Sequence, residues 1–306
     1  MAEIAPFDLT WSFLRNSVIG LFAKTRTQLQ SSKVETFCGV QFYKRIKNMS
    51  QWFEKEDFWV TYAPVMFDDA HWQEAPTVAQ YVKKIAQLHD GDSVLDAGCG
   101  LGRISVELAA MNLDVTGVDI IQSELDAAHE SAEAEGVPLK LINADLRTFV
   151  SPKKFDCAVN LYTSFGYCDT EKEDMQIIKN IAASVKKGGT FILECVSRET
   201  AILYFTKGEI FERAGVKVAT HFSVEGAWEG LRSHWTLYSK DTSDSQIKNG
   251  NAKPLADHVF VQRLYSAPEL CKKMIECGFS QAKAYGDFDF SPYNEKARTM
   301  VIVAKK

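Results

Sequence analysis

The sequence predicts an α/β fold in which a mostly parallel β-sheet carries helices on both faces. Two observations lead to this prediction. From Ser93 to Cys195, short apolar runs alternate with segments of helical periodicity, which is the pattern of βαβ units in a parallel sheet. The first apolar run, Ser93 to Ala97, ends in a glycine-rich turn that opens the next helix. Such a turn places a ligand at the carboxyl end of the first strand.

The composition sets limits on the class of protein. The chain has 306 residues, of which 46% are hydrophobic and 25% charged, and its formal net charge is −5. This length is sufficient for one large core, or for a core domain with an appended piece. Proteins that follow a phosphate backbone usually present a basic face, and the chain has no Lys/Arg run that would form one. The sequence therefore disfavours a nucleic-acid partner.

The cysteines and the apolar segments indicate a cytoplasmic protein. The seven cysteines include no Cys-x-x-Cys pair, and several lie inside apolar runs, so we expect free thiols in a reducing compartment and no metal site. No segment reaches the roughly 20 apolar residues that span a bilayer. The apolar run near the start, NSVIGLFA, lacks a clear small-residue cleavage site, which argues against a signal peptide. Stable membrane insertion is not expected.

Residues 1–75 are predicted to form a helical, aromatic-rich extension ahead of a main domain at 76–306. Apolar residues at helical spacing predict an amphipathic helix over residues 9–29. This helix could pack on the main domain, pack on a second subunit of a homodimer, lie on a membrane surface, or close over a site as a lid. Residues 50–75 contain seven aromatic side chains, which must be buried or cover a ligand.

The main domain is predicted to begin with a helix from Pro76 to about Leu88. Strands are expected at residues 93–97, 114–118, 140–144, 155–161 and 190–195. Between them, helices are expected over 102–111, from a Ser123 cap to Gly136, and from a Thr170 capping box to Lys187. A small antiparallel insertion is predicted at about 200–265, because strand-like runs there are joined without helices. A capping box at Ser266 then begins the last helix, and a strand closes the chain.

The glycine turn carries the chemical information. Its glycines are Gly98, Gly100 and Gly102. A dinucleotide fingerprint has the spacing G-x-G-x-x-G, which seats a pyrophosphate on the helix N-terminus. Here Arg103 stands where the third glycine would be needed, so a dinucleotide is disfavoured. Asp96, in the strand before the turn, suits a cofactor with a free amino group, because a carboxylate binds an ammonium group.

The stretch from Val94 to Gly102, VLDAGCGLG, resembles the first motif of class I S-adenosylmethionine-dependent methyltransferases. Later segments match the family in register: Val115–Asp119 the second motif, Asn143–Leu146 the third, and Phe155–Leu161 the fourth strand. The resemblance covers residues 75–200 closely and 260–306 loosely. It implies a Rossmann-like, doubly wound, seven-stranded, mostly parallel sheet with an antiparallel C-terminal strand. It also implies S-adenosyl-L-methionine as cofactor and S-adenosyl-L-homocysteine as its product.

The resemblance assigns cofactor roles to individual residues. Asp119 would accept from both ribose hydroxyls, and Asp145 from the adenine amino group. Arg103 is either a solvated helix residue or a partner for a carboxylate of cofactor or substrate, and Cys99 is a small filler of the turn. The full cofactor set is Asp96, Gly98, Cys99, Gly100, Gly102, Arg103, Asp119, Ile120, Asp145, Leu146 and Asn160.

The residues after the fourth strand, Asn160 to Tyr167, select the acceptor in this family. They lack the Asn/Asp-Pro-Pro-aromatic stretch of DNA and protein amide methyltransferases, and they resemble bacterial small-molecule methyltransferases. The predicted substrate contacts are Trp59, Tyr62, Thr163, Ser164 and Tyr167. The candidate catalytic residues are Tyr62, Tyr167, His221 and His234, with His258 as a further candidate base. A base of this kind is expected to matter less than the alignment of the nucleophile with the methyl group, on which the rate of methyl transfer mainly depends.

The predicted function is methyl transfer of the EC 2.1.1 type to an N or O nucleophile of a small molecule. One alternative is a non-catalytic cofactor-binding subunit that recruits a partner through its N-terminal helix. A second is an NAD-dependent oxidoreductase, against which Arg103 counts, and methylation of RNA or protein is a third. The sequence identifies neither the acceptor nor the choice between nitrogen and oxygen.

Overall fold

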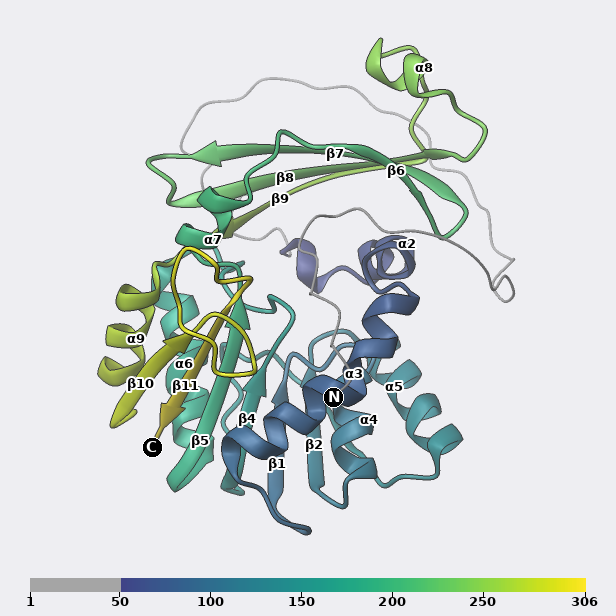
Figure 1. The fold of residues 1–306 in the computed structure, drawn as a ribbon. Coiled ribbons are helices and arrows are strands. Elements are labelled where there is room, and N and C mark those ends of the chain that lie inside the picture. Colours follow the sequence, from purple (N-terminus) through teal and green to yellow (C-terminus); the bar gives the residue numbers. More distant parts are fainter. Residues whose placement is uncertain (1–50) are drawn as a thin grey trace, which may run out of the picture.

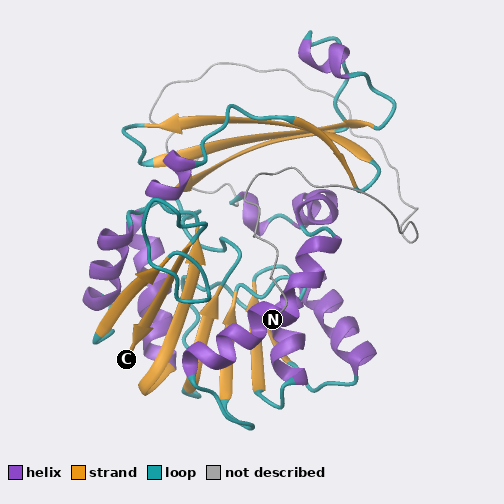
Figure 2. Cartoon of the chain, viewed as in Figure 1, coloured by secondary structure: helices purple, strands orange, loops and turns teal. Residues whose placement is uncertain are grey.

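The computed structural model of the chain describes residues 51–306. The helix predicted over residues 9–29 and the thiol of Cys38 lie outside these residues. Figure 1 shows two sheets, one of which lies across the upper strand ends of the other. Figure 2 shows that helices flank the lower sheet, whereas the outer face of the upper sheet carries no packed helix among the described residues.

The lower sheet has seven strands in the order β10-β11-β5-β4-β1-β2-β3. Their bounds are β1 (Ser93–Ala97), β2 (Asp114–Asp119), β3 (Lys140–Asn143), β4 (Phe155–Asn160), β5 (Val185–Cys195), β10 (Gln281–Tyr285) and β11 (Met300–Lys305). β11 is antiparallel to both of its neighbours, and the other neighbouring pairs are parallel. The predicted doubly wound sheet with an antiparallel C-terminal strand is confirmed.

Alternation along the central strands creates two apolar cores, one on each face of the lower sheet. In β1, Val94 belongs to one core and Leu95 to the other. The Val94 core is covered by α3 (Asp69–Ala86) and α4 (Arg103–Ala110), and the Leu95 core by α6 (Glu171–Ser184) and α9 (Ala267–Glu276). Helix α5 (Gln122–Glu135) lies beside α4. Strands buried on both faces explain the continuous apolar runs of the sequence.

The upper sheet is the predicted antiparallel insertion. Its strands, in the order β6-β7-β8-β9, are β6 (Ile210–Arg213), β7 (Val216–Glu225), β8 (Gly230–Ser239) and β9 (Ala256–Arg263). All neighbouring pairs are antiparallel. The short helix α7 (Arg198–Leu203) leads into the sheet from β5, and α8 (Asp244–Lys248) lies in the exposed loop between β8 and β9.

The segment before the main domain packs beneath the upper sheet. Helices η1 (Trp52–Glu54) and α2 (Glu56–Met66) lie between the two sheets in Figure 1. A third apolar core joins Phe58 and Tyr62 of α2 to Trp235 of β8. Arg213 of β6 fastens the helices to the sheet by donating to the carbonyl of Val65 at 3.0 Å. Aromatic residues of the segment 52–66 therefore pack against the upper sheet and hold it above the lower sheet.

Three predicted helix boundaries are wrong: two are set by hydrogen bonds to a nearby aspartate and one by strand pairing. Helix α3 begins at Asp69 instead of Pro76, because the Asp68 side chain caps it by accepting from the amide of His71. Helix α3 crosses residue 75, where the boundary between the extension and the main domain was predicted. That domain boundary stays a prediction. Helix α5 has no side-chain cap at Ser123; Asp119 instead accepts from the amide that precedes the helix.

Helix α6 ends at Ser184 instead of Lys187, since Val185 pairs with Phe155 and begins β5. The capping boxes predicted at Thr170 and Ser266 are confirmed. The six cysteines within residues 51–306 are all free thiols. In that same range, no helix combines the length and apolar character needed to cross a membrane.

Candidate active site

A cavity with a volume of about 820 Å³ lies between the two sheets. One part, the glycine-turn half, is lined by residues within 96–104, 119–124 and 144–147, which follow strands β1, β2 and β3. The other part, the aromatic half, is lined by residues within 52–67 and 222–262, from η1, α2 and strands β7 to β9. Residues 161–168, after β4, form the junction of the two halves, since Ser164 lies beside Gly98 and the Tyr167 ring packs against that of Trp52 at 5.0 Å.

The glycine turn adopts a backbone that side chains would disturb. Gly98 and Gly102 have φ values of +83° and +75°, in the left-handed region that glycine accepts without strain. A Cβ atom on Gly102 would lie 2.7 Å from the Cβ of Ala128 in α5, and one on Gly98 would lie 3.1 Å from the Cβ of Ser164. The turn therefore needs glycine both for its conformation and for close approach to its neighbours.

Asp119 and Asp96 bring two carboxylates to this turn. Asp119 accepts from the amide of Gly100 at 2.9 Å and from that of Ile121 at 3.0 Å, and burial raises its pKa. Asp96 accepts from the Ser105 hydroxyl at 2.6 Å, and burial raises its pKa to about 6. Both acids line the cavity. A glycine cradle with one acid beside a diol position and one suited to an ammonium group fits S-adenosylmethionine.

Glu124 is a third acid in this half, and the sequence analysis missed it. Its side chain is only 4% exposed, and no described residue forms a hydrogen bond with its Oε1 atom. Burial raises its pKa to about 8. Its Oε2 would lie 3.1 Å from a Cβ atom on Gly100. Its spacing from Ala128, which lies one turn further along the buried face of α5, was the available signal.

Asp145 and Leu146 line the same half together with Ile120. The Asp145 carboxylate accepts two hydrogen bonds from Arg147 Nε, at 3.0 and 2.8 Å. Arg147 also pairs with Glu54 of η1. The third strand end is thus tied to the segment that covers the cavity.

Two members of the predicted cofactor set lie behind the cavity wall. Asn160 is fully buried and donates from Nδ2 to the carbonyl of Ala97 at 2.6 Å, which holds β4 against β1. Its side chain does not line the cavity, and the predicted cofactor contact stays a prediction. Gly102 also lies outside the lining, and its part is to let α4 begin against Ala128.

Arg103 is buried, which excludes the solvated alternative. Its side chain is 6% exposed, and its guanidinium lies 4.3 Å from the ring centre of Tyr162 and 5.2 Å from that of Phe67. It also donates to the carbonyl of His71. Because it lines the cavity, a carboxylate could still reach it.

The junction after β4 holds an unusual backbone. Tyr162 and Thr163 have φ values of +54° and +60°, both in the left-handed region. Such strain in residues other than glycine persists only where the surroundings enforce it, and it gathers at functional sites. Thr163, Ser164 and Tyr167 all line the cavity, as expected for substrate contacts; their roles stay predictions.

Glu74 of α3 also lines the cavity, and the sequence analysis missed it. The Tyr162 hydroxyl is a hydrogen-bonding neighbour of the Glu74 carboxylate, and no other described group within residues 51–306 forms a hydrogen bond with Glu74 Oε1 or with that hydroxyl. Burial raises the pKa of Glu74 to about 7. The spacing of Glu74 from Val78 and Val82, on the buried face of a helix, could have indicated it. The sequence analysis placed the start of that helix after Glu74.

Tyr62 is part of the core instead of the cavity wall. Its hydroxyl donates to the carbonyl of Trp235 at 3.1 Å, and burial raises its pKa to about 12. Tyr62 does not line the cavity, and its predicted catalytic and substrate roles stay predictions. Trp59 and Tyr167, by contrast, do line the cavity.

The two histidines chosen as candidate bases lie on the wrong face of the upper sheet. His221 and His234 are cross-strand partners, and alternation places both opposite to Phe222 and Trp235, which line the cavity. His221 is exposed, and His234 pairs with Asp257 at 2.6 Å.

His258 points to the inner face, where it packs among aromatic rings such as Phe58, with a ring separation of 4.6 Å. It does not line the cavity either. Within residues 51–306, no three His, Cys, Asp or Glu side chains are grouped so that they could hold a metal ion.

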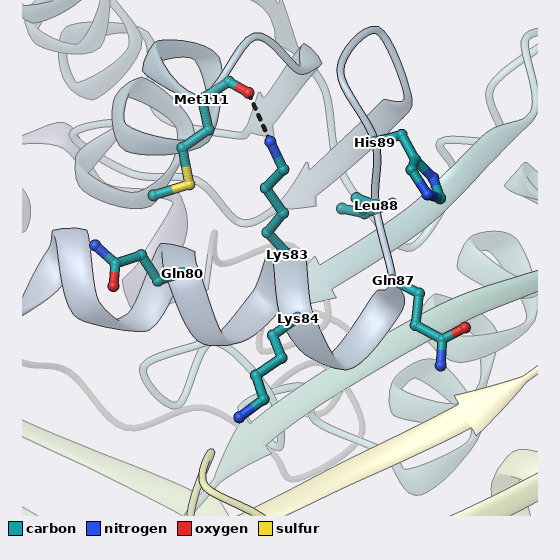
Figure 3. A pocket seen from close by; sticks show the side chains of 7 residues that line it. All are labelled: Gln80, Lys83, Lys84, Gln87, Leu88, His89 and Met111. Atoms are coloured by element: carbon teal, nitrogen blue, oxygen red, sulfur yellow. Dashed lines mark hydrogen bonds between the residues drawn. The ribbon is translucent and has the colours of Figure 1, made fainter.

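A smaller hollow of about 360 Å³ lies near the amino end of β1, at the opposite end of the strands from the large cavity (Figure 3). Its side chains come from the end of α3, from the turn before β1 and from Met111, and Lys83 donates to the Met111 carbonyl at 3.1 Å. Ligands of such sheets bind outside the carboxyl ends of the strands, whereas this hollow lies at the amino end of β1. It holds no carboxylate and no part of the glycine turn.

Comparison with known proteins shows what this part of the chain resembles. Residues 94–189 match the family model described as a methyltransferase domain. This segment contains the glycine turn, Asp119 and Asp145, which the fold brings to one edge of the sheet. Over these residues, which are less than half of the chain, the protein is similar to methyltransferases. The chain is also similar to curated methyltransferases. YqeM from Bacillus subtilis (strain 168), a candidate methyltransferase by its name, is 23% identical over 229 residues, which are 74% of this chain and 90% of YqeM.

A second relative and two solved structures complete the comparison. The ubiquinone biosynthesis O-methyltransferase of Rickettsia felis is 27% identical over 127 residues, 40% of this chain and 50% of that enzyme. An S-adenosylmethionine-dependent methyltransferase from Clostridium acetobutylicum matches with a TM-score of 0.64 at 16% identity, covering 81% of this chain and 97% of its own. CalS10, an amino pentose methyltransferase from Micromonospora echinaspora, matches with a TM-score of 0.53 at 17% identity, covering 90% and 100%. These structures share the fold of this chain.

Proposed function

We propose that the protein transfers the methyl group of S-adenosylmethionine to a nitrogen or oxygen nucleophile of a small molecule. The observation that carries this proposal is the continuous cavity. Its glycine-turn half has the acids and the backbone that a nucleoside cofactor needs. Its aromatic half adjoins the glycine-turn half through residues 161–168, where Ser164 lies beside Gly98 and Tyr167 packs against Trp52. Two ligands bound end to end would meet at this junction.

The residues of the chain would align and enclose the two ligands. Bound S-adenosylmethionine would supply a methyl group already activated by its sulfonium centre. Asp119 would bind the ribose hydroxyls, and Asp96 would face the amino group of the cofactor. Trp59 and Trp235 would exclude water from the other end. Alignment of two bound reactants accounts for much of the rate of such transfers.

The shape of the cavity supports a small acceptor. Its volume of about 820 Å³ falls within the roughly 300 to 1,000 Å³ of small-molecule pockets, and the upper sheet covers it. Among similar proteins, the Rickettsia felis enzyme acts on oxygen in ubiquinone biosynthesis, and KedS8 from a Streptoalloteichus species is a sugar N-methyltransferase. A cytoplasmic location and a homodimer remain predictions.

Calorimetry tests the cofactor half of the proposal. We expect both S-adenosylmethionine and S-adenosylhomocysteine to bind at micromolar concentrations. Asp119→Ala should weaken binding at least about 100-fold, because it removes charge-assisted hydrogen bonds to two hydroxyls. Asp114→Ala removes an exposed acid from the amino end of the same strand and should leave binding unchanged. Absence of binding by both compounds at tens of micromolar would end the proposal.

A labelling experiment tests the transfer itself. The protein is incubated with small-molecule extract and methyl-deuterated cofactor, and labelled products are sought by mass spectrometry. We expect at least one product heavier by the labelled methyl group. Cofactor binding without any labelled product would favour the non-catalytic binding subunit instead.

A further inference from the structure

Glu74 is a carboxylate for which the cofactor provides no partner. It comes from α3 and lines the cavity where the two halves meet, close to Tyr162. Burial, the charge of Glu74 and a hydrogen bond to Glu74 all raise the pKa of the Tyr162 hydroxyl, so the two groups interact directly. Asp119 at the end of β2 and Asp96 in β1 are the acids proposed to bind the cofactor. Glu74, on α3, is therefore available to the acceptor.

The groups around Glu74 leave its charge unbalanced. Arg103 of α4 is the cation that most affects it, but its guanidinium is held by the His71 carbonyl and by the Tyr162 ring. Glu194 of β5 and Asp68, the cap of α3, add negative charge. The Tyr162 hydroxyl interacts with the Glu74 carboxylate through a hydrogen bond, and no other described group donates to the Oε1 atom. A carboxylate has about four lone-pair sites, so a single donor leaves most of its acceptor capacity unmet.

The ligand that best satisfies this arrangement is a cation with hydrogen-bond donors. An ammonium group would donate to Glu74 Oε1 and offset the negative charge of Glu74 and Glu194, while its apolar body would lie against the aromatic half. A phenolate or carboxylate acceptor would be repelled by the same two acids. An alkanol would need a much stronger base than a carboxylate to lose its proton.

We propose that the methyl acceptor is an amine with an apolar body, that its ammonium group binds Glu74, and that Glu74 removes the proton that blocks its lone pair. This inference rests on the proposed methyl transfer and specifies its substrate class. Glu74 is then a catalytic residue, because its Oε1 contacts the reacting group. Tyr162 and Thr163 hold the strained turn against which the amine would lie.

The step balances in atoms and charge. One N–H proton of the ammonium group passes to Glu74 Oε1, and the nitrogen regains its lone pair. The nitrogen forms the N–CH₃ bond as the S–CH₃ bond breaks, and the electron pair of that bond stays on sulfur. The methylated nitrogen carries one positive charge, and the proton on Glu74 leaves to solvent. A base whose pKa is raised to about 7 by burial suits such transfers near neutral pH.

Binding of matched probes tests the substrate class. Calorimetry is carried out with saturating S-adenosylhomocysteine and with 2-phenylethylamine, 2-phenylethanol or 3-phenylpropanoate, which differ in charge at one end. We expect the ammonium probe to bind at least about tenfold more tightly than either isostere, as one charge-assisted hydrogen bond provides. Glu74→Gln should abolish this preference. Asp69→Asn, which removes an exposed acid from the same helix, should keep it. A preference that is absent, or that survives in Glu74→Gln, overturns the inference.

The labelled product and the pH profile test the proton transfer. We expect the methyl group on a nitrogen, and a wild-type rate that rises with pH through about 7 as Glu74 ionises. Glu74→Gln should lower the rate about 100-fold and remove that rise, while Asp69→Asn keeps both. A labelled methyl ether or ester overturns the inference but leaves the proposed function intact. If the wild-type protein bound no S-adenosylhomocysteine and gave no labelled product, methyl transfer itself would be refuted.

Discussion

The two halves of the cavity are built in different ways. The glycine-turn half takes its groups from the ends of β1, β2 and β3, which are near one another in sequence. The aromatic half brings Trp59 of α2 together with Trp235 of β8, which lie far apart in sequence. Parallel strands deliver whatever follows them to one edge of a sheet, so the first half follows from local order. The second half depends on how separate segments pack.

This difference explains where each half is vulnerable. In the glycine turn, the single residue Gly102 determines both the backbone conformation and the contact with Ala128 of α5. In the aromatic half, many side chains share the packing, so a single change should have a smaller effect. Four predictions test this contrast, from the largest expected effect to the smallest.

The largest effect is expected for Gly102→Ala. The new Cβ would meet that of Ala128 at 2.7 Å, in a residue with φ of +75°, so strain and overpacking together should lower the free energy of unfolding by about 3 to 4 kcal/mol. Gly136→Ala shares a left-handed φ of +67° but has open space around its Cβ, and should cost only about 1 kcal/mol. Urea denaturation measures both, and equal losses would contradict the close approach at Gly102.

Glu124 should make stability depend on pH. Its pKa of about 8 in the folded protein lies above the ordinary 4.5, so its contribution is complete below pH 4.5 and is lost as pH rises through 8. Between pH 5 and 8 the unfolding free energy of the wild type should therefore fall by about 3 kcal/mol more than that of Glu124→Gln. The control Glu130→Gln, an exposed position on the same helix, should follow the wild type. Parallel curves for wild type and Glu124→Gln would refute this.

A smaller effect is expected at the joint under the upper sheet. Tyr62→Phe removes the hydrogen bond to the carbonyl of Trp235 but keeps the packing of the ring. The unfolding free energy should fall by about 1 kcal/mol, and the methyl-transfer rate should not change, because the hydroxyl does not reach the cavity. A large loss of rate with unchanged stability would support the catalytic role predicted for Tyr62.

The smallest effect is expected on the outer face of the upper sheet. His221→Ala alters an exposed side chain, so stability should stay within about 0.5 kcal/mol and the rate should be unchanged. His234→Ala loses only its half-exposed pair with Asp257, which should cost no more than about 1 kcal/mol. A bell-shaped pH–rate profile that either variant abolishes would show that one of these histidines does act as a base.

Most of the fold was predictable, and the site only in part. The order of strands and helices followed from periodicity, and the glycine turn with Asp119 and Asp145 was found by spacing. Asn160 was assigned to the cofactor because it ends a strand, yet its amide faces the neighbouring strand. Glu74 was missed because the helix was predicted to begin at Pro76, whereas the cap at Asp68 starts it before Glu74.

The sequence by itself determined the parallel sheet, its antiparallel insertion and the cofactor turn, because periodicity and glycine spacing act over a few residues. Only the tertiary structure decided which side chains face the acceptor. Alternation on β7 and β8 turned His221 and His234 outward, and the packing of α3 against the turn after β4 brought Glu74 to Tyr162. The outward face of β7 and β8 has no local signal, since it depends on which face another segment covers. The helical spacing of Glu74 from Val78 is local, but its position beside Tyr162 depends on packing.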